Sequence, residues 1–338
     1  MILLDCDDLC RCGGMVDAID SKSIIRKDVE VRVLSSALEV RKQKYPQCGV
    51  FLFVLVSFYM QRLIVICGPT ATGKSDYAVQ LAKQLAKDGI KSEIISADSR
   101  QVYKGLDIGS GKITVQEMEG IPHHLLDVAS PKRTFTVAQY KKLADKAIKD
   151  IVKRNKVPII VGGTGFYIDA VVFNQQFPEV GPNKALRKSL ERLSLDDLRQ
   201  KLQELDIERY QTIDIHNRVR MIRAIEIAAV LGKVPVQEPR TAKYAVEWIY
   251  IDLPDDVLKE RIHDRLLKRM KQGMVTEIAE LHAQGLSWKR LEALGLEYGY
   301  VAMYLQEKLS KEEMLIQLEA AIWQYVKRQR AWFKKYAK

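Results

Sequence analysis

One stretch of the chain constrains its fold more than any other: a short apolar run at residues 63–67, followed at once by a glycine-rich octet. The octet has the form GxxxxGK[ST] and reads Gly68-Pro69-Thr70-Ala71-Thr72-Gly73-Lys74-Ser75. Beyond it, apolar residues recur at helical spacing from Tyr77 to Leu85. A strand that leads into a glycine loop and then a helix is typical of a P-loop, the phosphate site of nucleotide-binding and ATP-binding proteins. A glycine turn that binds nothing would require neither flank.

The residue types of this octet indicate the chemistry of its ligand. Loop N–H groups and the positive end of the helix dipole face an anion, and Lys74 adds a positive charge. The hydroxyl of Ser75 can bind Mg²⁺. The sequence therefore predicts a diphosphate or triphosphate ligand and Mg²⁺ as the cofactor.

The charge of the chain points to a second, larger ligand. The 338 residues have a formal net charge of +11, and residues 1–59 contain equal numbers of basic and acidic side chains. The whole excess therefore lies in residues 60–338, which predicts a polyanionic partner such as a nucleic acid. Only one cysteine, Cys67, follows residue 60, so this part fits a reduced, cytoplasmic protein without disulfides. Cys6, Cys10 and Cys12 lack a second ligand pair, and no zinc site is predicted there.

Residues 1–59 differ from the remainder because they show no sustained helical or strand period. Parts of them, such as Val31-Arg32-Val33-Leu34, resemble the conceptual translation of a bacterial tRNA gene. We hypothesise that residues 1–59 are a foreign extension from a mis-called start and that translation begins at Met60. The apolar run at 50–60 is short for a transmembrane helix, and a signal-peptide cleavage site would fall inside the octet, so we expect no membrane segment.

From residue 60 onward, strand and helix patterns alternate. Strands are predicted at 62–67, 93–96, 124–128, 157–161 and 246–251, with helices at 74–88 and from Thr136 to about residue 155. This alternation predicts an α/β fold with a doubly wound parallel sheet. Residues 178–231 carry only helical patterns, and further helical patterns run from residue 255 to the C-terminus. We therefore expect a catalytic core at 60–177 and 232–338, interrupted by a helical insertion at 178–231 that contacts the nucleic acid.

Three polar clusters follow three of the predicted strands: the octet, residues 98–101 and residues 162–165. Ligands of open parallel sheets bind beyond the carboxyl ends of the strands, so these clusters should meet in one crevice. Hydrolases of the P-loop class usually have an apolar strand that ends in a metal-binding Asp. Here the strand at 157–161 ends in Gly-Gly-Thr, and only Asp98 ends an apolar strand. This pattern weighs against a nucleotide hydrolase.

Motifs along nearly all of residues 60–338 resemble one family. The matching segments, in chain order, are the octet, 95–112 (ISADSRQVYKGLDIGSGK), 122–127 (PHHLLD), 161–165 (VGGTG), 217–226 (NRVRMIRAIE), 261–273 and 327–330 (KRQR). In these motifs the chain resembles the bacterial tRNA dimethylallyltransferases, which are P-loop prenyltransferases. The run at 95–112 is the most specific of them.

The resemblance implies transfer of a dimethylallyl group from its diphosphate to the exocyclic amine of the adenine 3′ of the anticodon. It implies that Thr164 and Arg265 stabilise the departing diphosphate together with Lys74. The adenine amine is a poor nucleophile, so a carboxylate at the strand end, Asp98, is the candidate base. The target base must leave the anticodon-loop stack, and Ser99, Arg100 and Gln101 are expected to line its route. The expected partners are tRNA and dimethylallyl diphosphate, and the expected state is a monomer.

Plainer alternatives remain for these residues. Asp98 could act only as a cap or as a Mg²⁺ ligand. Arg265 lies at helical spacing with Arg261 and Arg269, and such a row is usually a solvated face. In the insertion, Arg218, Arg220 and Arg223 are candidates for binding tRNA phosphates, with a solvated face as the alternative.

The C-terminal residues 323–335 interleave aromatic and basic side chains. A stripe from Leu315 through Leu318 and Ile322 to Tyr325 should face the core, so the aromatic residues are expected to pack. The basic face is a further candidate for tRNA phosphates.

Two other functions compete with a tRNA dimethylallyltransferase. One is a prenyltransferase of free adenine nucleotides, which would need neither the basic charge nor the helical insertion. The other is a P-loop kinase or ATP-driven nucleic-acid-binding module, which explains neither the Gly-Gly-Thr strand end nor the run at 95–112.

Overall fold

A computed structural model of the protein describes residues 62–236 and 241–336. The extension at 1–59, its cysteines and the apolar run at 50–60 lie outside the described residues. A doubly wound α/β fold was the prediction, and it is confirmed: five parallel strands form one sheet in the order β3-β2-β4-β1-β5. The strands are β1 (Arg62–Cys67), β2 (Ser92–Ser96), β3 (His123–His124), β4 (Val157–Gly162) and β5 (Ala245–Tyr250).

The central strand β1 shows why this sequence forms a buried parallel sheet. Every residue of β1 after Arg62 is buried, as expected for a strand that is covered on both faces. Its side chains alternate between two hydrophobic clusters: Leu63 and Val65 belong to one, Ile64 and Ile66 to the other. A continuous apolar run therefore supplies both layers at once.

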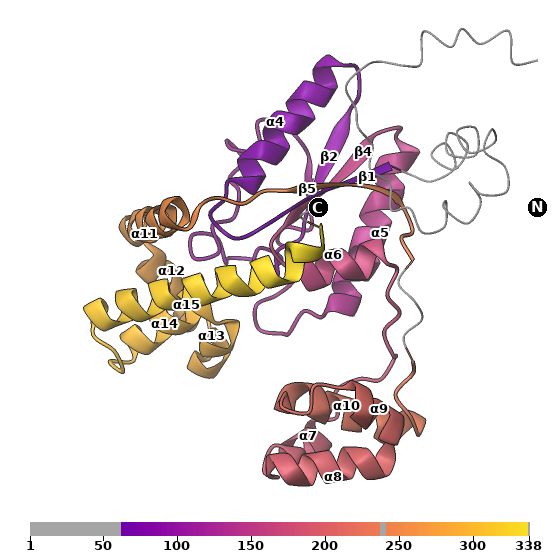
Figure 1. The fold of residues 1–338 in the computed structure, drawn as a ribbon. Helices are drawn as coiled ribbons and strands as arrows, with labels where there is room; N and C mark the ends of the chain where they lie inside the picture. Colours follow the sequence, from indigo (N-terminus) through magenta and orange to yellow (C-terminus); the bar gives the residue numbers. More distant parts are fainter. Residues whose placement is uncertain (1–61, 237–240, 337–338) are drawn as a thin grey trace, which may run out of the picture. The chain divides into compact units, whose positions relative to one another are not determined.

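Helices cover the two faces of the sheet (Figure 1). Ala78, Val79 and Ala82 of α4 (Lys74–Lys87) pack in the cluster of Ile64 and Ile66. The opposite cluster holds residues of α5 (Val137–Lys153), α6 (Gly165–Val172) and the C-terminal helices. Thr136 and Gln139 form a reciprocal capping box at the start of α5, which fixes where that helix begins.

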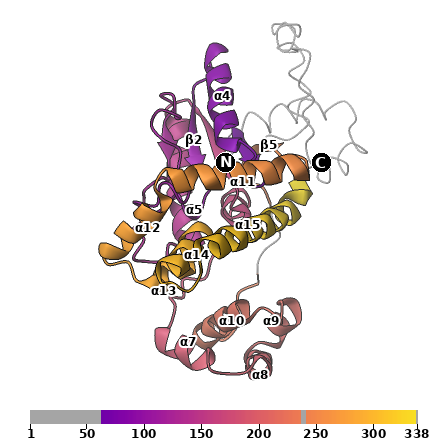
Figure 2. The same cartoon turned by 90° about the vertical axis from the view of Figure 1, so that its left-hand side faces the viewer.

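Five C-terminal helices follow β5. They are α11 (Asp255–Lys271), α12 (Met274–Ala283), α13 (Trp288–Leu294), α14 (Leu296–Leu305) and α15 (Lys311–Phe333), and a 3₁₀ turn at Lys334–Tyr336 follows α15. Figure 2 shows the long α15 running beside α14. Residues of α11, α12, α14 and α15 belong to the same cluster as β1, so these helices complete the core.

The segment predicted as a helical insertion contains α7 (Lys184–Leu190), α8 (Leu195–Leu205), α9 (Ile207–Thr212) and α10 (Arg218–Leu231). Leu190, Leu198, Leu202, Met221 and Ile225 form a hydrophobic cluster of their own. The four helices therefore bury apolar surface against one another. Their assignment as a tRNA-binding domain stays a prediction.

Two boundaries differ from the sequence prediction. The strand expected at 124–128 is only His123–His124, because Leu125 and Asp127 adopt positive φ angles of 64° and 56° and turn the chain away from the sheet. The helix expected to reach about residue 155 ends at Lys153, and Asn155 has a φ of 54°. A left-handed residue cannot continue a strand or a right-handed helix.

Candidate active site

The carboxyl ends of the strands bring the three polar clusters together. Cys67 pairs in register with Gly162 and with Tyr250, so the segments that follow these strands emerge at one edge of the sheet. Across the ends of β2 and β4, Thr164 N donates to Ala97 O at 3.1 Å, and Ser99 N donates to the Thr164 hydroxyl at 3.1 Å. The predicted convergence of residues 98–101 with residues 162–165 is therefore present in the structure.

The P-loop owes its shape to its two glycines. A Cβ on Gly68 would lie 2.0 Å from Ile251 O, so only glycine fits where the loop leaves β1. Gly73 has a φ of 84° directly before α4 and lets the loop turn into the helix. Within the loop, Thr72 Oγ1 donates to Pro69 O at 3.0 Å. The turn at Gly73 leads directly into α4. The unpaired N–H groups in the first turn of this helix are the donors that phosphate binding requires.

Lys74 is the cation of this loop. Its Nζ donates to Pro69 O and lies 3.5 Å from the Thr72 hydroxyl. Desolvation by burial, with repulsion from Arg265, lowers the pKa of Lys74 to about 8, although Asp98 partly opposes this by favouring the charge. An ammonium that is poorly compensated in this way gains from a bound anion.

Asp98 closes a tight turn at the end of β2. Its Oδ1 accepts hydrogen bonds from Arg100 N at 2.7 Å and Gln101 N at 3.3 Å. The capping alternative therefore describes one oxygen of this carboxylate. Because Oδ2 takes no part in the turn, the capping contact leaves the other oxygen available to accept a proton.

Arg265 approaches the P-loop from α11. Its Nη1 lies 3.5 Å from the Thr70 hydroxyl, and the cavity between α11 and the P-loop is lined by Thr70, Ala71 and Arg265 among others. Burial and the neighbouring charge of Arg269 lower the pKa of Arg265 to about 10. Arg269 is only 7% exposed and donates to Glu297 at 2.8 Å. The arginine row on α11 is therefore not a solvated face at Arg265 or Arg269.

Residues of α15 also reach the crevice. The Gln329 side chain accepts from Thr70 N at 2.9 Å and donates to Gly163 O at 3.0 Å, so one amide joins the P-loop to the end of β4. The Tyr325 hydroxyl bonds to Thr164, and burial raises the pKa of Tyr325 to about 12. Sequence reasoning missed Gln329 because it looked for cations in 327–330.

A signal for Gln329 was present in the sequence. The buried positions of α15 are Met314, Leu318, Ile322, Val326, Gln329 and Phe333. A glutamine within a buried apolar stripe requires hydrogen-bond partners, and the partners here belong to the site. The stripe predicted from Leu315 to Tyr325 is buried at Leu318 and Ile322 but only partly buried at its two ends.

Some basic residues near the C-terminus form ion pairs with acidic side chains of the core. Arg330 Nε donates to Asp252 at 2.9 Å, and Lys335 Nζ donates to the buried Asp169 at 2.8 Å. These two cations hold α15 and the turn after it to the core. They leave the basic face predicted for this segment smaller than the sequence indicates.

The arginines of α10 contact groups of their own helical segment. Arg218 donates to the carbonyls of Leu193 and Glu191, and Arg223 donates to Val180 O at 2.6 Å. Arg220 has a side chain that is 61% exposed and lies 4.0 Å from Asp214. Of the three candidates, Arg220 is the one that presents its charge to solvent.

The histidine pair at 123 and 124 has protein partners. His123 Nδ1 lies 2.8 Å from Ile121 O, and His124 Nε2 lies 2.6 Å from the buried carboxylate of Glu93. Among residues 62–236 and 241–336, no cluster of three or more His, Cys, Asp or Glu side chains could hold a metal ion. In those same ranges, no helix is both long and apolar enough to cross a bilayer.

The fold and crevice define a P-loop α/β protein in which the strand-end carboxylate of Asp98 lies near the cations Lys74 and Arg265. Comparison with known proteins identifies its family. The family model described as IPP transferase matches residues 101–336. A curated relative, tRNA dimethylallyltransferase 2 of Treponema denticola, is 42% identical over 280 residues, covering 81% of this chain and 92% of the relative. The chain belongs to the IPP transferase family.

Solved structures agree with this assignment. The full-length tRNA isopentenylpyrophosphate transferase of Bacillus halodurans is 34% identical, with a TM-score of 0.60 over 82% of this chain and 88% of that one. A eukaryotic dimethylallyltransferase, solved acting on tRNA, is 26% identical, with a TM-score of 0.68 over 81% of this chain and 70% of that one.

Proposed function

We propose that this chain transfers a dimethylallyl group from dimethylallyl diphosphate to the exocyclic amine of the adenine 3′ of the anticodon in tRNA. The observation that carries the proposal is the crevice itself. Ser99, next to Asp98, donates to the Thr164 hydroxyl at the ends of β2 and β4, Lys74 belongs to the P-loop beside them, and Arg265 reaches that loop from α11. The family relationship supports the same reaction.

Two charges develop in this reaction, a negative charge on the departing diphosphate and a positive charge on the attacking amine, and different residues stabilise each of them. The bond between C1 of the dimethylallyl group and the diphosphate oxygen breaks, and a bond from the adenine nitrogen to C1 forms. Lys74, Arg265 and the P-loop N–H groups stabilise the negative charge on the departing diphosphate. Asp98 accepts the proton that the amine loses, and Thr164 holds the backbone beside Asp98 through Ser99 N.

Mg²⁺ fits this site only as a metal shared with the substrate. Mg²⁺ commonly takes one or two protein ligands and completes its shell with phosphate oxygens and water. The exposed Ser75, in the first turn of α4, suits that arrangement, and a cage made of protein carboxylates is not present among the described residues. When bound, the ion would neutralise charge on the leaving diphosphate.

The tRNA would be held by the positive surface of residues 60–338 and by the helical insertion. The chain's charge of +11 supports a polyanionic partner, whereas free adenine nucleotides would need only the crevice. The adenine would be flipped out of the loop stack to reach Asp98, and Arg100 and Gln101 follow Asp98 on the same turn.

A direct assay tests the proposal. The full chain is incubated with Mg²⁺, dimethylallyl diphosphate and unmodified tRNA that carries adenine 3′ of the anticodon, and nucleosides are analysed by mass spectrometry. A five-carbon mass gain on tRNA alone supports the proposal. A gain on free AMP would replace tRNA by a small acceptor, and ATP turnover without prenylation would make the protein a kinase or ATPase.

Asp98→Asn tests the assigned base. The Asn oxygen can accept the same two bonds from Arg100 N and Gln101 N, so the turn is preserved while the proton acceptor is lost. We expect the chemical step to fall by roughly 10²- to 10⁴-fold with tRNA affinity nearly unchanged. Asp256→Asn, an exposed residue of α11, is the matched control. Near-normal turnover of Asp98→Asn would leave Asp98 with the capping role alone.

A further inference from the structure

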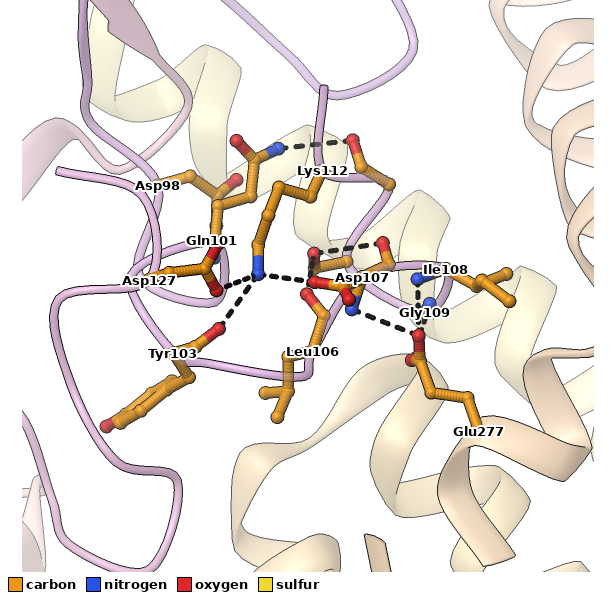
Figure 3. Close-up of polar contacts among 12 residues, drawn as sticks. Asp98, Gln101, Tyr103, Leu106, Asp107, Ile108, Gly109, Lys112, Asp127 and Glu277 are labelled. Atoms are coloured by element: carbon orange, nitrogen blue, oxygen red, sulfur yellow. Dashed lines mark hydrogen bonds and ion pairs between the residues drawn. The ribbon is translucent and has the colours of Figure 1, made fainter. Parts of the chain in front are cut away.

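The loop at residues 107–111 is held by a carboxylate from another part of the chain. Glu277 of α12 accepts hydrogen bonds from three consecutive backbone N–H groups (Figure 3). Its Oε2 accepts from Asp107 N at 3.0 Å and Ile108 N at 2.6 Å, and its Oε1 accepts from Gly109 N at 3.1 Å. The hydroxyl of the buried Tyr298 donates to Oε1 at 3.0 Å. Each carboxylate oxygen therefore receives two donors.

The other end of this loop is held from the core. Lys112 Nζ donates to Tyr103 O at 2.9 Å and forms ion pairs with Asp107 at 2.6 Å and Asp127 at 2.5 Å. Its side chain is only 7% exposed. Figure 3 shows Lys112, at the end of the loop itself, directing its amine toward Tyr103, Asp107 and Asp127, whereas Glu277 reaches the loop from α12. The loop is thus fixed between the sheet side of the crevice and the C-terminal helices.

The same loop contacts the groups assigned to the reaction. A Cβ on Gly111 would lie 1.8 Å from Arg269 Nη2 and 2.4 Å from Arg265 Nη2, so both guanidinium groups rest against this glycine. Arg269 Nη1 donates to Gly109 O at 3.2 Å, and Gln101 Nε2 donates to Gly111 O at 3.2 Å. A shift of the loop would therefore move Arg265 on one side and Gln101 on the other.

We propose that Glu277 is a positioning residue that fixes Arg265 against the diphosphate site through the loop at 107–111. This inference rests on the proposed function of Arg265. Three backbone donors and one phenol converge on the Glu277 carboxylate, and charged acceptors give stronger bonds than neutral ones. A displacement of about 1 Å at a reacting group can lower a rate by on the order of 10²-fold, so a remote anchor can matter to the reaction.

Glutamine is not a conservative replacement here. Because both oxygens of Glu277 accept two bonds, an amide would place an NH₂ group against two N–H or O–H donors. We expect Glu277→Gln to lower kcat by about 10- to 100-fold, with the Kd for tRNA unchanged. Glu280→Gln, an exposed carboxylate on the same helix, is the matched control and should retain wild-type kcat. Tyr298→Phe removes one of the four donors and should give a smaller loss.

A double-mutant cycle separates positioning from general damage. If Glu277 acts through Arg265, Glu277→Gln should cost little further activity in an Arg265→Gln background. Additive losses, or a wild-type kcat for Glu277→Gln, would overturn the proposal. Where Glu277→Gln does not fold, the cycle is run with Tyr298→Phe, which keeps the carboxylate and its three backbone bonds.

Two readouts do not depend on catalysis and keep this inference distinct from the proposed function. Amide hydrogen exchange at residues 107–109 should be slow in the wild type and faster in Glu277→Gln. The affinity for inorganic pyrophosphate should fall about tenfold in Glu277→Gln, and it should fall no further when Glu277→Gln is added to Arg265→Gln. If the wild type binds pyrophosphate but does not prenylate tRNA, the proposed function fails while the positioning role stands. Unchanged exchange and pyrophosphate affinity would remove the positioning role alone.

Discussion

Helices α10 and α11 each carry three arginines, and the two helices use them differently. On α11, Arg265 and Arg269 are turned inward, where Arg265 faces the Thr70 hydroxyl and Arg269 pairs with Glu297. On α10, Arg218 and Arg223 donate to backbone carbonyls of the insertion, and Arg220 faces solvent. The sequence pattern is similar, but the groups opposite each guanidinium are not.

This difference teaches what decides the role of an arginine. A guanidinium always carries its charge, so the neighbouring groups determine what the charge is for. Burial and the charge of Arg269 lower the pKa of Arg265 to about 10, so a bound anion would stabilise the charged guanidinium. Carbonyl partners already satisfy Arg218, which therefore stabilises structure. Only a solvent-facing guanidinium such as Arg220 remains available to phosphates of a large ligand.

The largest expected effect is at Arg265. Arg265→Gln removes the charge beside the P-loop, and we expect kcat to fall by about 10²- to 10³-fold, as for loss of one oxyanion-stabilising group. Single-turnover kinetics with saturating dimethylallyl diphosphate measure the chemical step. Lys268→Gln removes an exposed cation from the same helix and is the matched control. If both variants lose activity equally, the loss does not come from the position of the Arg265 charge beside the P-loop.

Replacing Arg218 should lower the stability of the helical insertion and leave catalysis unchanged, which is the opposite of the effect expected at Arg265. Its guanidinium bonds to the carbonyls of Leu190, Glu191 and Leu193, at and beyond the end of α7. Loss of charge-assisted bonds costs about 1.5–3 kcal/mol, so Arg218→Ala should weaken the insertion by that amount. Hydrogen exchange of α7 and α10 amides measures it, with Arg220→Ala as control. Unchanged exchange combined with weaker tRNA binding would make Arg218 a phosphate ligand.

Local patterns made most of the fold predictable. The strand at 62–67 matches β1 residue for residue, because a short continuous apolar run followed by a glycine loop leaves few alternatives. The strand ends then placed Asp98 and Thr164 together by topology alone. The short strand predicted at 124–128 exists but stops at His124, because single left-handed residues at 125 and 127 have no signal in hydrophobic periodicity.

The parts of the site that sequence reasoning missed depend on long-range packing. Gln329 lies 259 residues from Thr70, and Glu277 lies 170 residues from Asp107. A local sequence pattern does not predict which loop a buried amide or carboxylate will hydrogen-bond. It can only indicate that a polar group in an apolar stripe needs partners, as at Gln329. The direction that Arg265 faces was undecidable for the same reason, because it depends on the P-loop opposite.

Within the crevice, the pH dependence of diphosphate binding should distinguish the contribution of Lys74 from that of Arg265. The pKa of Lys74 is lowered to about 8 and that of Arg265 to about 10, so Lys74 is the first of the two to lose its charge as pH rises. The Kd for dimethylallyl diphosphate should be flat below about pH 7.5 and should weaken by roughly tenfold per pH unit above 8. Calorimetric titration between pH 7 and 9.5 measures this dependence, and Lys74→Met should abolish the slope.

The sign of this pH effect distinguishes binding from folding. In the unfolded chain Lys74 keeps its proton up to about pH 10.5, whereas the folded chain releases it near 8. The unfolded state therefore binds more protons between those values, and the stability of the unliganded protein rises with pH across that window. Binding that weakens over the same interval cannot then be attributed to unfolding. A Kd that is constant to pH 9.5 would contradict a lowered pKa at Lys74.

The smallest expected effect, at Arg220, sharpens the comparison most. Arg220→Ala removes an exposed charge whose carboxylate neighbour lies 4.0 Å away, so it should leave stability within about 0.5 kcal/mol. If Arg220 contacts a tRNA phosphate, its removal should weaken binding only a few-fold and reduce the slope of log K against log salt by about one. Filter binding at several salt concentrations measures the slope, and Lys233→Ala, a 66% exposed cation just beyond α10, is the control. An unchanged slope would place Arg220 on a solvated face, and the insertion would then need another cation to meet the tRNA.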